Sequence, residues 1–179
     1  NIGFDRKLMV AFLRNNIGYP AKKGFIPKGL PGTSDKEIEY DPKLAKRLVE
    51  DYIKQSGERP TLKLATDSNY IDLCEYLQRE FQKIGIEIII NVMQTASLRQ
   101  AKSSGKLELF RASWIADYPD AENYLSLFNS INFSPNGPNY THYKNLTFDK
   151  MYKNSLKILS DSLRFKKYKL MDSLAFSDF

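Results

Sequence analysis

The feature that most constrains the fold is a pair of β-strand patterns with an amphipathic helix pattern between them. The strands are predicted at residues 61–66 and 86–92, and the helix at residues 69–84, where Gly85 ends it. The helix places a stripe of apolar side chains on one face: Tyr70, Leu73, Cys74, Leu77, Phe81 and Ile84. Strands joined in this way pair in parallel with a right-handed crossover, so the sequence predicts a βαβ unit.

The pattern continues beyond this unit. A short helix is predicted to begin at Thr95 and end near Ser104, and a third strand is predicted at residues 107–114. The order β-α-β-α-β is typical of an α/β fold with helices on the faces of the sheet. We expect residues 61–128 to form this core.

The chain on the N-terminal side of the core predicts helices and a wrapping loop, together residues 1–60. Residues 1–16 carry an apolar helix face, and residues 20–40 are rich in Pro and Gly, which favours an irregular surface segment. Asp41 is a good N-cap for the next helix, and Gly57 is positioned to end it.

The C-terminal side, residues 129–179, predicts a loop rich in Asn, Pro and Gly and then two helices. The helices are expected at residues 148–159 and 161–174, packed on the sheet. Because the chain begins with Asn and stops without a polar tail, we expect residues 1–179 to be one excised domain.

Composition is ordinary for a soluble globular protein, with 42% hydrophobic and 27% charged residues. The net charge of +6 comes from scattered Lys and Arg, which favours solvated helix faces over a nucleic-acid surface. No apolar run is long enough for a membrane-spanning helix. The single Cys74 excludes a disulfide framework and is expected to be a small buried side chain.

The sequence contains few residue patterns that are typical of a catalytic site or a metal site. His142 is the only histidine, and no nucleophile pattern lies near it, so we expect it to be a hydrogen-bond partner within its loop. Neither the spacing of metal ligands nor a Gly-rich phosphate loop is present. The sequence therefore predicts no enzyme activity, no metal and no cofactor.

The best candidate for a binding site lies where the third predicted strand runs into a turn. Trp114 and Asp117 are three residues apart there, and Asp120 is a good N-cap for the helix that follows. Ligands bind outside the carboxyl ends of strands in open α/β sheets. Two plainer interpretations stay open: Asp117 as a turn residue that accepts backbone amides, and Trp114 as a core residue.

Five motifs, in this order, carry a resemblance to a known family. They are Asn1-Ile-Gly-Phe-Asp5-Arg6, Pro27-Lys-Gly29-Leu-Pro31-Gly32, Tyr40-Asp41-Pro42-Lys-Leu-Ala45-Lys46-Arg-Leu48, Leu77-Gln-Arg-Glu-Phe81-Gln-Lys-Ile84-Gly85-Ile86 and Trp114-Ile-Ala-Asp117-Tyr118-Pro119-Asp120. In the last motif, Ala121 stands where proline is usual. The chain resembles the family 5 extracellular solute-binding proteins, the peptide and nickel receptors of ABC importers.

The resemblance implies a periplasmic-binding-protein-like lobe with additional C-terminal helices, most of the C-terminal lobe of a two-lobed clamp. It implies a peptide ligand and, as partners, the N-terminal lobe of the same protein and the permease subunits of an ABC transporter. The protein would work in the periplasm or on the extracellular face of the membrane, which it would meet only through the permease or an upstream lipid anchor. No nucleic acid is implied.

The resemblance also assigns roles to particular residues. Asp117 would take the α-ammonium of a bound peptide, and Trp114 and Tyr118 would line the cleft beside it. Arg111 is a candidate partner for the ligand carboxylate, although strand alternation could equally point it to solvent. Two loop residues, Asn139 and Tyr140, would add further ligand contacts.

Two alternatives remain beside the peptide receptor. One is a relative with the same fold that binds another solute, such as a nickel chelate or an oligosaccharide. The other is an unrelated enzyme or nucleic-acid module. The Asp117 carboxylate separates the peptide receptor from a sugar receptor, because it suits an ammonium group and has no obvious purpose for a neutral sugar.

Overall fold

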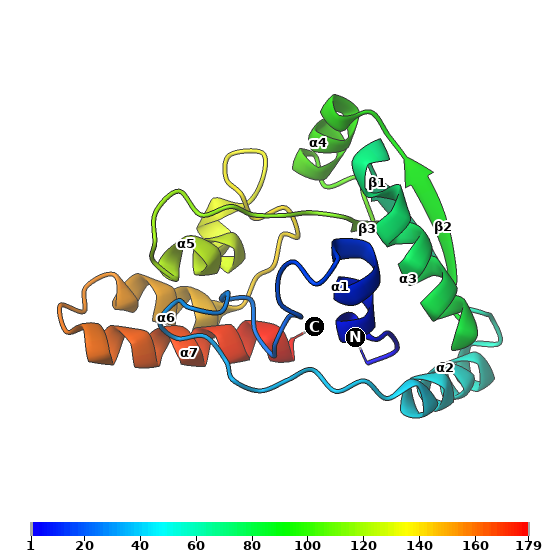
Figure 1. Ribbon diagram of the computed structural model, residues 1–179. Helices are drawn as coiled ribbons and strands as arrows, with labels where there is room; N and C mark the ends of the chain where they lie inside the picture. Colours follow the sequence, from blue (N-terminus) through cyan, green and yellow to red (C-terminus); the bar gives the residue numbers. More distant parts are fainter. Residues whose placement is uncertain (1, 179) are drawn as a thin grey trace. The chain divides into compact units, whose positions relative to one another are not determined.

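The computed structural model describes residues 2–178, so the parts of the predictions that fall on Asn1 and Phe179 lie outside the described residues (Figure 1). The chain divides into two compact units, which are described separately below. The first unit comprises Asn1–Pro20, Ile38–Lys102 and Lys106–Ala112. The second unit comprises Ala21–Glu37, Ser103–Gly105 and Ser113–Phe179. The assignment of all of these residues to a single lobe stays a prediction.

The first unit contains a parallel sheet with the strand order β2-β1-β3. The central strand β1, Thr61–Thr66, pairs along its whole length with β2, Glu87–Val92. On its other side it pairs with β3, which consists of Leu109–Phe110. The parallel βαβ unit and the α/β class are therefore confirmed.

The third strand is much shorter than predicted. We expected residues 107–114, but the ladder with β1 contains only the pairs Leu64 with Leu109 and Ala65 with Phe110. The last backbone bond runs from the Arg111 N–H to the Ala65 carbonyl, at 2.9 Å. Beyond this point β1 itself ends at Thr66, so the residues after Arg111 do not continue the ladder.

The predicted crossover helix begins with a short 3-10 turn, η1, Ser68–Tyr70, and continues as α3, Ile71–Lys83. Cys74 on α3 is completely buried against Leu64 and Ile88 of the sheet, which confirms its predicted role as a small core residue. Burial raises the pKa of the Cys74 thiol, which keeps it in the neutral form that suits an apolar core.

Among residues 2–178, three other helices lie wholly or almost wholly in the first unit. The predicted α2, Pro42–Ser56, is confirmed, with the Asp41 carboxylate capping its N-terminus and Gly57 in the left-handed conformation at its end. α4 spans Thr95–Ser103. α1, Arg6–Arg14, is shorter than the predicted helix at 1–16, because the Asp5 side chain accepts the first free N–H groups.

The apolar face predicted for α1 is not part of a core. No residue of α1 is buried, and Phe12 is 71% exposed.

The second unit has a core of its own, formed by α5 (Glu122–Leu125), the 3-10 turn η2 (Ser126–Phe128), α6 (Leu146–Ser155) and α7 (Asp161–Ser177). A further 3-10 turn, η3, covers Ser130–Asn132.

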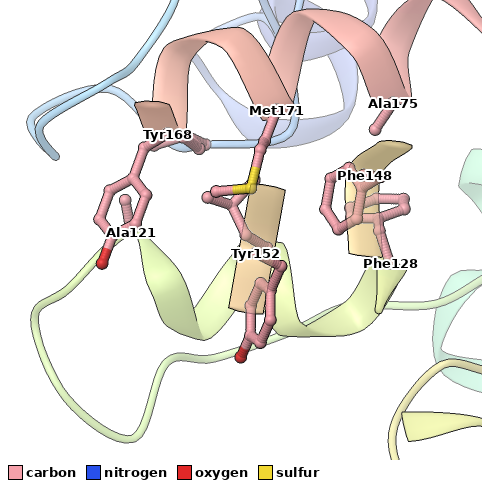
Figure 2. Packing of buried hydrophobic residues seen from close by; sticks show 9 residues of the cluster. Ala121, Phe128, Phe148, Tyr152, Tyr168, Met171 and Ala175 are labelled. Carbon is pink, nitrogen blue, oxygen red and sulfur yellow. The ribbon is translucent and has the colours of Figure 1, made fainter. Parts of the chain in front are cut away.

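The predicted C-terminal helices supply most of this core. Phe148 and Tyr152 of α6 face Met171 of α7, and the same cluster includes Ala121 and Phe128 beside α5 (Figure 2). We expected these helices to pack on the sheet, but the core to which they contribute consists of residues of the second unit. The reason is that Phe148 and Tyr152 of α6 share one apolar cluster with Met171 and Ala175 of α7.

The loop predicted at 20–40 is irregular and is anchored by a buried carboxylate. Oδ1 of Asp172 on α7 accepts hydrogen bonds from the backbone N–H groups of Phe25, at 2.6 Å, and Ile26, at 3.2 Å. Asp172 is 1% exposed, and burial raises the pKa of its carboxyl group.

Among residues 2–178, no helix combines the length and apolar character needed to cross a bilayer.

Candidate functional site

The candidate site in the second unit is built around the loop that runs from Ser113 into α5. Asp117 lies in the middle of this loop and is exposed. Within residues 2–178 its carboxylate has no hydrogen bond or ion pair, so the alternative in which it accepts nearby backbone amides is not what the structure shows. A charged oxygen pair held in water without a partner is available to a cationic ligand group.

Trp114 stands on the N-terminal side of the same loop. Its ring is half-buried, and the indole N–H donates a hydrogen bond of 2.6 Å to Oδ1 of Asn123 on α5. Asn123 is only 4% exposed. Trp114 is therefore neither a fully buried core residue nor a freely moving one, because its polar edge is bonded to the interior and part of its ring remains accessible.

Tyr118 follows Asp117 and is tied to the start of α5. Its hydroxyl donates to Oε2 of Glu122, and the hydroxyl of Tyr152 on α6 donates to Oε1 of the same carboxylate. The hydrogen bond to Glu122 raises the pKa of Tyr118, with burial adding to the shift. Burial, followed by the hydrogen bond to Glu122, raises the pKa of Tyr152. Both hydroxyls therefore keep their protons at neutral pH and act as donors.

Asp120 closes the loop on its C-terminal side. Its Oδ1 accepts the backbone N–H of Glu122 at 2.8 Å. The predicted N-cap role is off by one residue, because α5 begins at Glu122 and its N-cap is Ala121. Oδ2 of Asp120 lies 3.8 Å from Nη2 of Arg164 on α7. Side chains on both sides of Asp117 are thus bonded to helices of the second unit.

Asn139 lies in the long loop between η3 and α6 and is completely buried. Its side-chain N–H groups donate to the carbonyls of Asn129, at 3.1 Å, and Tyr143, at 3.0 Å. Its Oδ1 accepts from the Thr141 hydroxyl and the Tyr143 backbone N–H, both at 3.2 Å. Asn139 is therefore a structural residue of this loop, and its contact with a ligand stays a prediction.

The neighbouring Tyr140 is half-buried, and its backbone N–H donates to the Pro138 carbonyl at 2.9 Å. Its contact with a ligand also stays a prediction.

His142 is bonded as expected for a residue that organises its own loop, with Nε2 2.9 Å from the Ser134 hydroxyl oxygen. Its ring stacks on Phe133, with 5.0 Å between the ring centroids.

Arg111 belongs to the first unit, whereas the other five predicted site residues belong to the second. Its guanidinium carbon lies 3.1 Å from the centroid of the Tyr70 ring, a cation–π contact, and Arg111 is half-buried. Arg14 approaches the same ring at 5.8 Å. The Arg111 side chain is therefore stacked on Tyr70 rather than pointing freely into solvent, the other possibility left by strand alternation.

Three residues that organise the loop were not predicted from the sequence: Glu122, Asn123 and Tyr152. Glu122 follows Tyr118 by four residues, a spacing that could have suggested their contact. Asn123 and Tyr152 carry no local signal, because their partners come from other elements. Among the residues that the structure describes, no group of His, Cys, Asp and Glu side chains could hold a metal ion.

Comparisons with known proteins assign the chain to a family. Residues 1–135 match the family model described as "Bacterial extracellular solute-binding proteins, family 5 Middle". The oligopeptide-binding protein OppA of Bacillus subtilis is 25% identical over 163 residues, which are 84% of this chain and 29% of that protein. Di/tripeptide-binding protein 2 of Pseudomonas aeruginosa is 24% identical over 178 residues, 94% of this chain and 32% of that protein. The chain thus spans about a third of the length of these relatives or less.

The fold has a match among solved structures. The periplasmic binding protein DppA of Helicobacter pylori, in complex with the peptide STSA, superposes with a TM-score of 0.87 at 21% sequence identity. The match covers 99% of this chain and 35% of that one. At this identity the likeness establishes the fold of a lobe of a periplasmic binding protein. Because the family model matches most of its length, the chain belongs to the bacterial extracellular solute-binding proteins of family 5.

Proposed function

We propose that the chain is part of the substrate-binding component of an ABC importer, which captures peptides by their termini and delivers them to a membrane permease. The family supports a binding protein for a solute, and the two named relatives are an oligopeptide-binding and a di/tripeptide-binding protein. The observation that carries the proposal is the exposed Asp117 carboxylate without a partner among residues 2–178.

The chemistry of the loop fits a peptide amino terminus. An α-ammonium group carries a positive charge and three N–H donors, and a carboxylate such as Asp117 supplies the opposite charge and the acceptors. The partly accessible ring of Trp114 and the half-exposed Tyr118 offer apolar surface beside it. Because these contacts involve only the terminus, they tolerate many side chains further along the peptide.

The opposite end of a short peptide requires a cation. Arg111 carries one at the end of β3, and its stacking on Tyr70 limits the rotamers that it can adopt. We propose that it takes the ligand carboxylate. Asn139 and Tyr140 would then add contacts through the loop that Asn139 organises.

The complete protein would add an N-terminal lobe, and the ligand would favour the closed state in which both lobes contact it. The permease is proposed as the partner that receives the closed form, in the periplasm or at the extracellular membrane surface. No covalent step is required. A non-peptide solute such as a nickel chelate or an oligosaccharide is the second candidate, but no feature of the site favours it.

The test measures peptide retention by the full-length protein. A defined mixture of tri- to pentapeptides is offered in free and N-acetylated form, and the bound peptides are identified and titrated by native mass spectrometry. The wild type should retain free peptides. Asp117→Asn should weaken this binding by about 2 to 5 kcal/mol, because closure of the complete protein around the peptide would bury the charge pair that Asp117 forms with the ammonium. Acetylated peptides, which lack the ammonium, should bind both proteins weakly.

The matched control is Asp35→Asn, because Asp35 is an exposed carboxylate of the same unit outside the candidate site. It removes the same charge and should leave peptide retention unchanged. If Asp117→Asn binds free peptides as tightly as the wild type, the role of Asp117 is wrong. If the wild type retains none of the peptides, the peptide function is wrong.

A further inference from the structure

We propose that Glu122 is a positioning residue for the peptide site, because its carboxylate ties the loop that carries Asp117 to the core of the second unit. The inference deepens the proposed function and rests on it. It concerns a group that does not touch the ligand in the arrangement proposed above. Its role is to restrict the motion of the residue beside the ligand-binding carboxylate.

The geometry places one carboxylate between two tyrosines. Tyr118 is adjacent to Asp117 in the chain, and its hydroxyl donates to Oε2 of Glu122. Tyr152 comes from α6, 30 residues after Glu122, and its hydroxyl donates to Oε1. The two oxygens of a single side chain therefore link the loop to another helix of the same unit.

The two ends of this link differ in their surroundings. Tyr152 is 7% exposed and belongs to the hydrophobic core, where its ring stacks on that of Phe148 with an interplanar angle of 16°. Tyr118 is 47% exposed. The hydrogen bonds to Glu122 thus connect the packed core to a solvent-facing side chain next to Asp117.

A carboxylate is better suited to this position than an amide. Both tyrosines keep their protons at neutral pH, so each needs an acceptor, and Glu122 offers one oxygen to each. Glutamine has one carbonyl oxygen and one N–H₂ group, so one hydroxyl would face a donor. Charge-assisted bonds are also stronger than neutral ones. A loop that is already ordered loses less conformational entropy when a ligand binds, so the binding is tighter.

The experiment uses the full-length protein and compares Glu122→Gln, Tyr152→Phe, their double variant and Asp117→Asn. Two quantities are measured: retention of the tri- to pentapeptide mixture, and hydrogen–deuterium exchange of the amides at residues 114–120 without peptide. Glu122→Gln and Tyr152→Phe should each weaken binding about 3- to 30-fold and speed exchange in this loop. The double variant should bind no more weakly than the weaker single variant, because both changes break the same link.

The matched control is Tyr124→Phe, which removes a hydroxyl on α5 that has no hydrogen bond among residues 2–178. It should change neither exchange nor affinity. Thermal unfolding of each variant separates positioning from a purely structural role. A lower melting temperature with unchanged loop exchange and unchanged affinity would overturn the inference.

Failure of this inference is distinguishable from failure of the proposed function. If Asp117→Asn loses peptides while Glu122→Gln and Tyr152→Phe change neither quantity, the peptide site stands and the role of Glu122 is wrong. If the wild type retains none of the peptides, the proposed function fails. If Asp117→Asn retains peptides fully, the role of Asp117 is wrong, and the inference fails with it because no ligand contact remains to be positioned.

Discussion

The indole N–H of Trp114 donates a 2.6 Å hydrogen bond to Oδ1 of Asn123, a residue that is only 4% exposed. The bond connects the loop that carries Asp117 to α5. Because Asn123 is held in the interior, the acceptor of this bond has a fixed position. The accessible part of the Trp114 ring therefore owes its orientation to a buried amide.

This bond makes Asn123 important for the stability of the second unit. In Asn123→Ala the indole N–H loses its acceptor and a buried site loses its polar partner, so we expect the free energy of unfolding to fall by about 1 to 3 kcal/mol. Urea unfolding followed by circular dichroism measures the change. The control is Asn154→Ala, an exposed position on α6, which should change stability by less than about 0.5 kcal/mol. Equal losses in both variants would contradict the prediction.

Asp172 should make the stability of the chain depend on pH. Burial raises the pKa of its carboxyl group above the unfolded value of about 3.9, although the N–H groups of Phe25 and Ile26 oppose the shift. The contribution of this group to stability is therefore fully present below the unfolded pKa, and it is lost as the pH rises through the folded pKa. Asp172→Asn keeps an acceptor oxygen and does not titrate.

We therefore expect the stability of Asp172→Asn relative to the wild type to increase as the pH rises from about 4 to 7. Urea unfolding of both proteins at several pH values in this window measures the difference, in which the titration of other groups largely cancels. A difference that is flat, or that shifts in favour of the wild type with rising pH, would show that the buried carboxyl group does not titrate as described.

Gly24 and Gly29 in the loop that Asp172 anchors should respond differently to alanine. Both have positive φ angles, +150° and +98°, so each substitution introduces backbone strain of about 1 to 2 kcal/mol. A Cβ at Gly24 would also lie 2.0 Å from Oδ2 of Asp172, whereas a Cβ at Gly29 meets no described heavy atom within 4 Å. Gly24→Ala should therefore be the more destabilising variant by about 1 to 3 kcal/mol in chemical denaturation. Similar losses at both sites would refute the close contact.

Local signals predicted the regular elements well. α2 follows from the Asp41 cap, its apolar stripe and Gly57, and all three act within one helix. The parallel pairing of β1 with β2 follows from the helix between them, because such a connection leaves few alternatives. Where a helix end depends on a nearby cap, as at Asp5, the boundary lies several residues from the predicted one.

Elements that depend on distant partners were predicted less well. The residues after Arg111 alternate like a strand, but a strand needs a neighbour, and β1 ends at Thr66. α6 and α7 have apolar faces that could have packed on a sheet, and only the packing of Phe148, Tyr152 and Tyr168 decides that they form a core with α5.

The amino-acid sequence alone determined the α/β class, the βαβ unit, the family and the position of Asp117 on a loop, because each depends on residues close together in the chain. Only the tertiary structure decided that Asp117 is exposed without a partner among residues 2–178, and that Asn123, Glu122 and Tyr152 hold the loop around it. The physical reason is that burial and hydrogen-bond geometry are properties of side chains brought together from separate elements, and no local pattern encodes which of them meet.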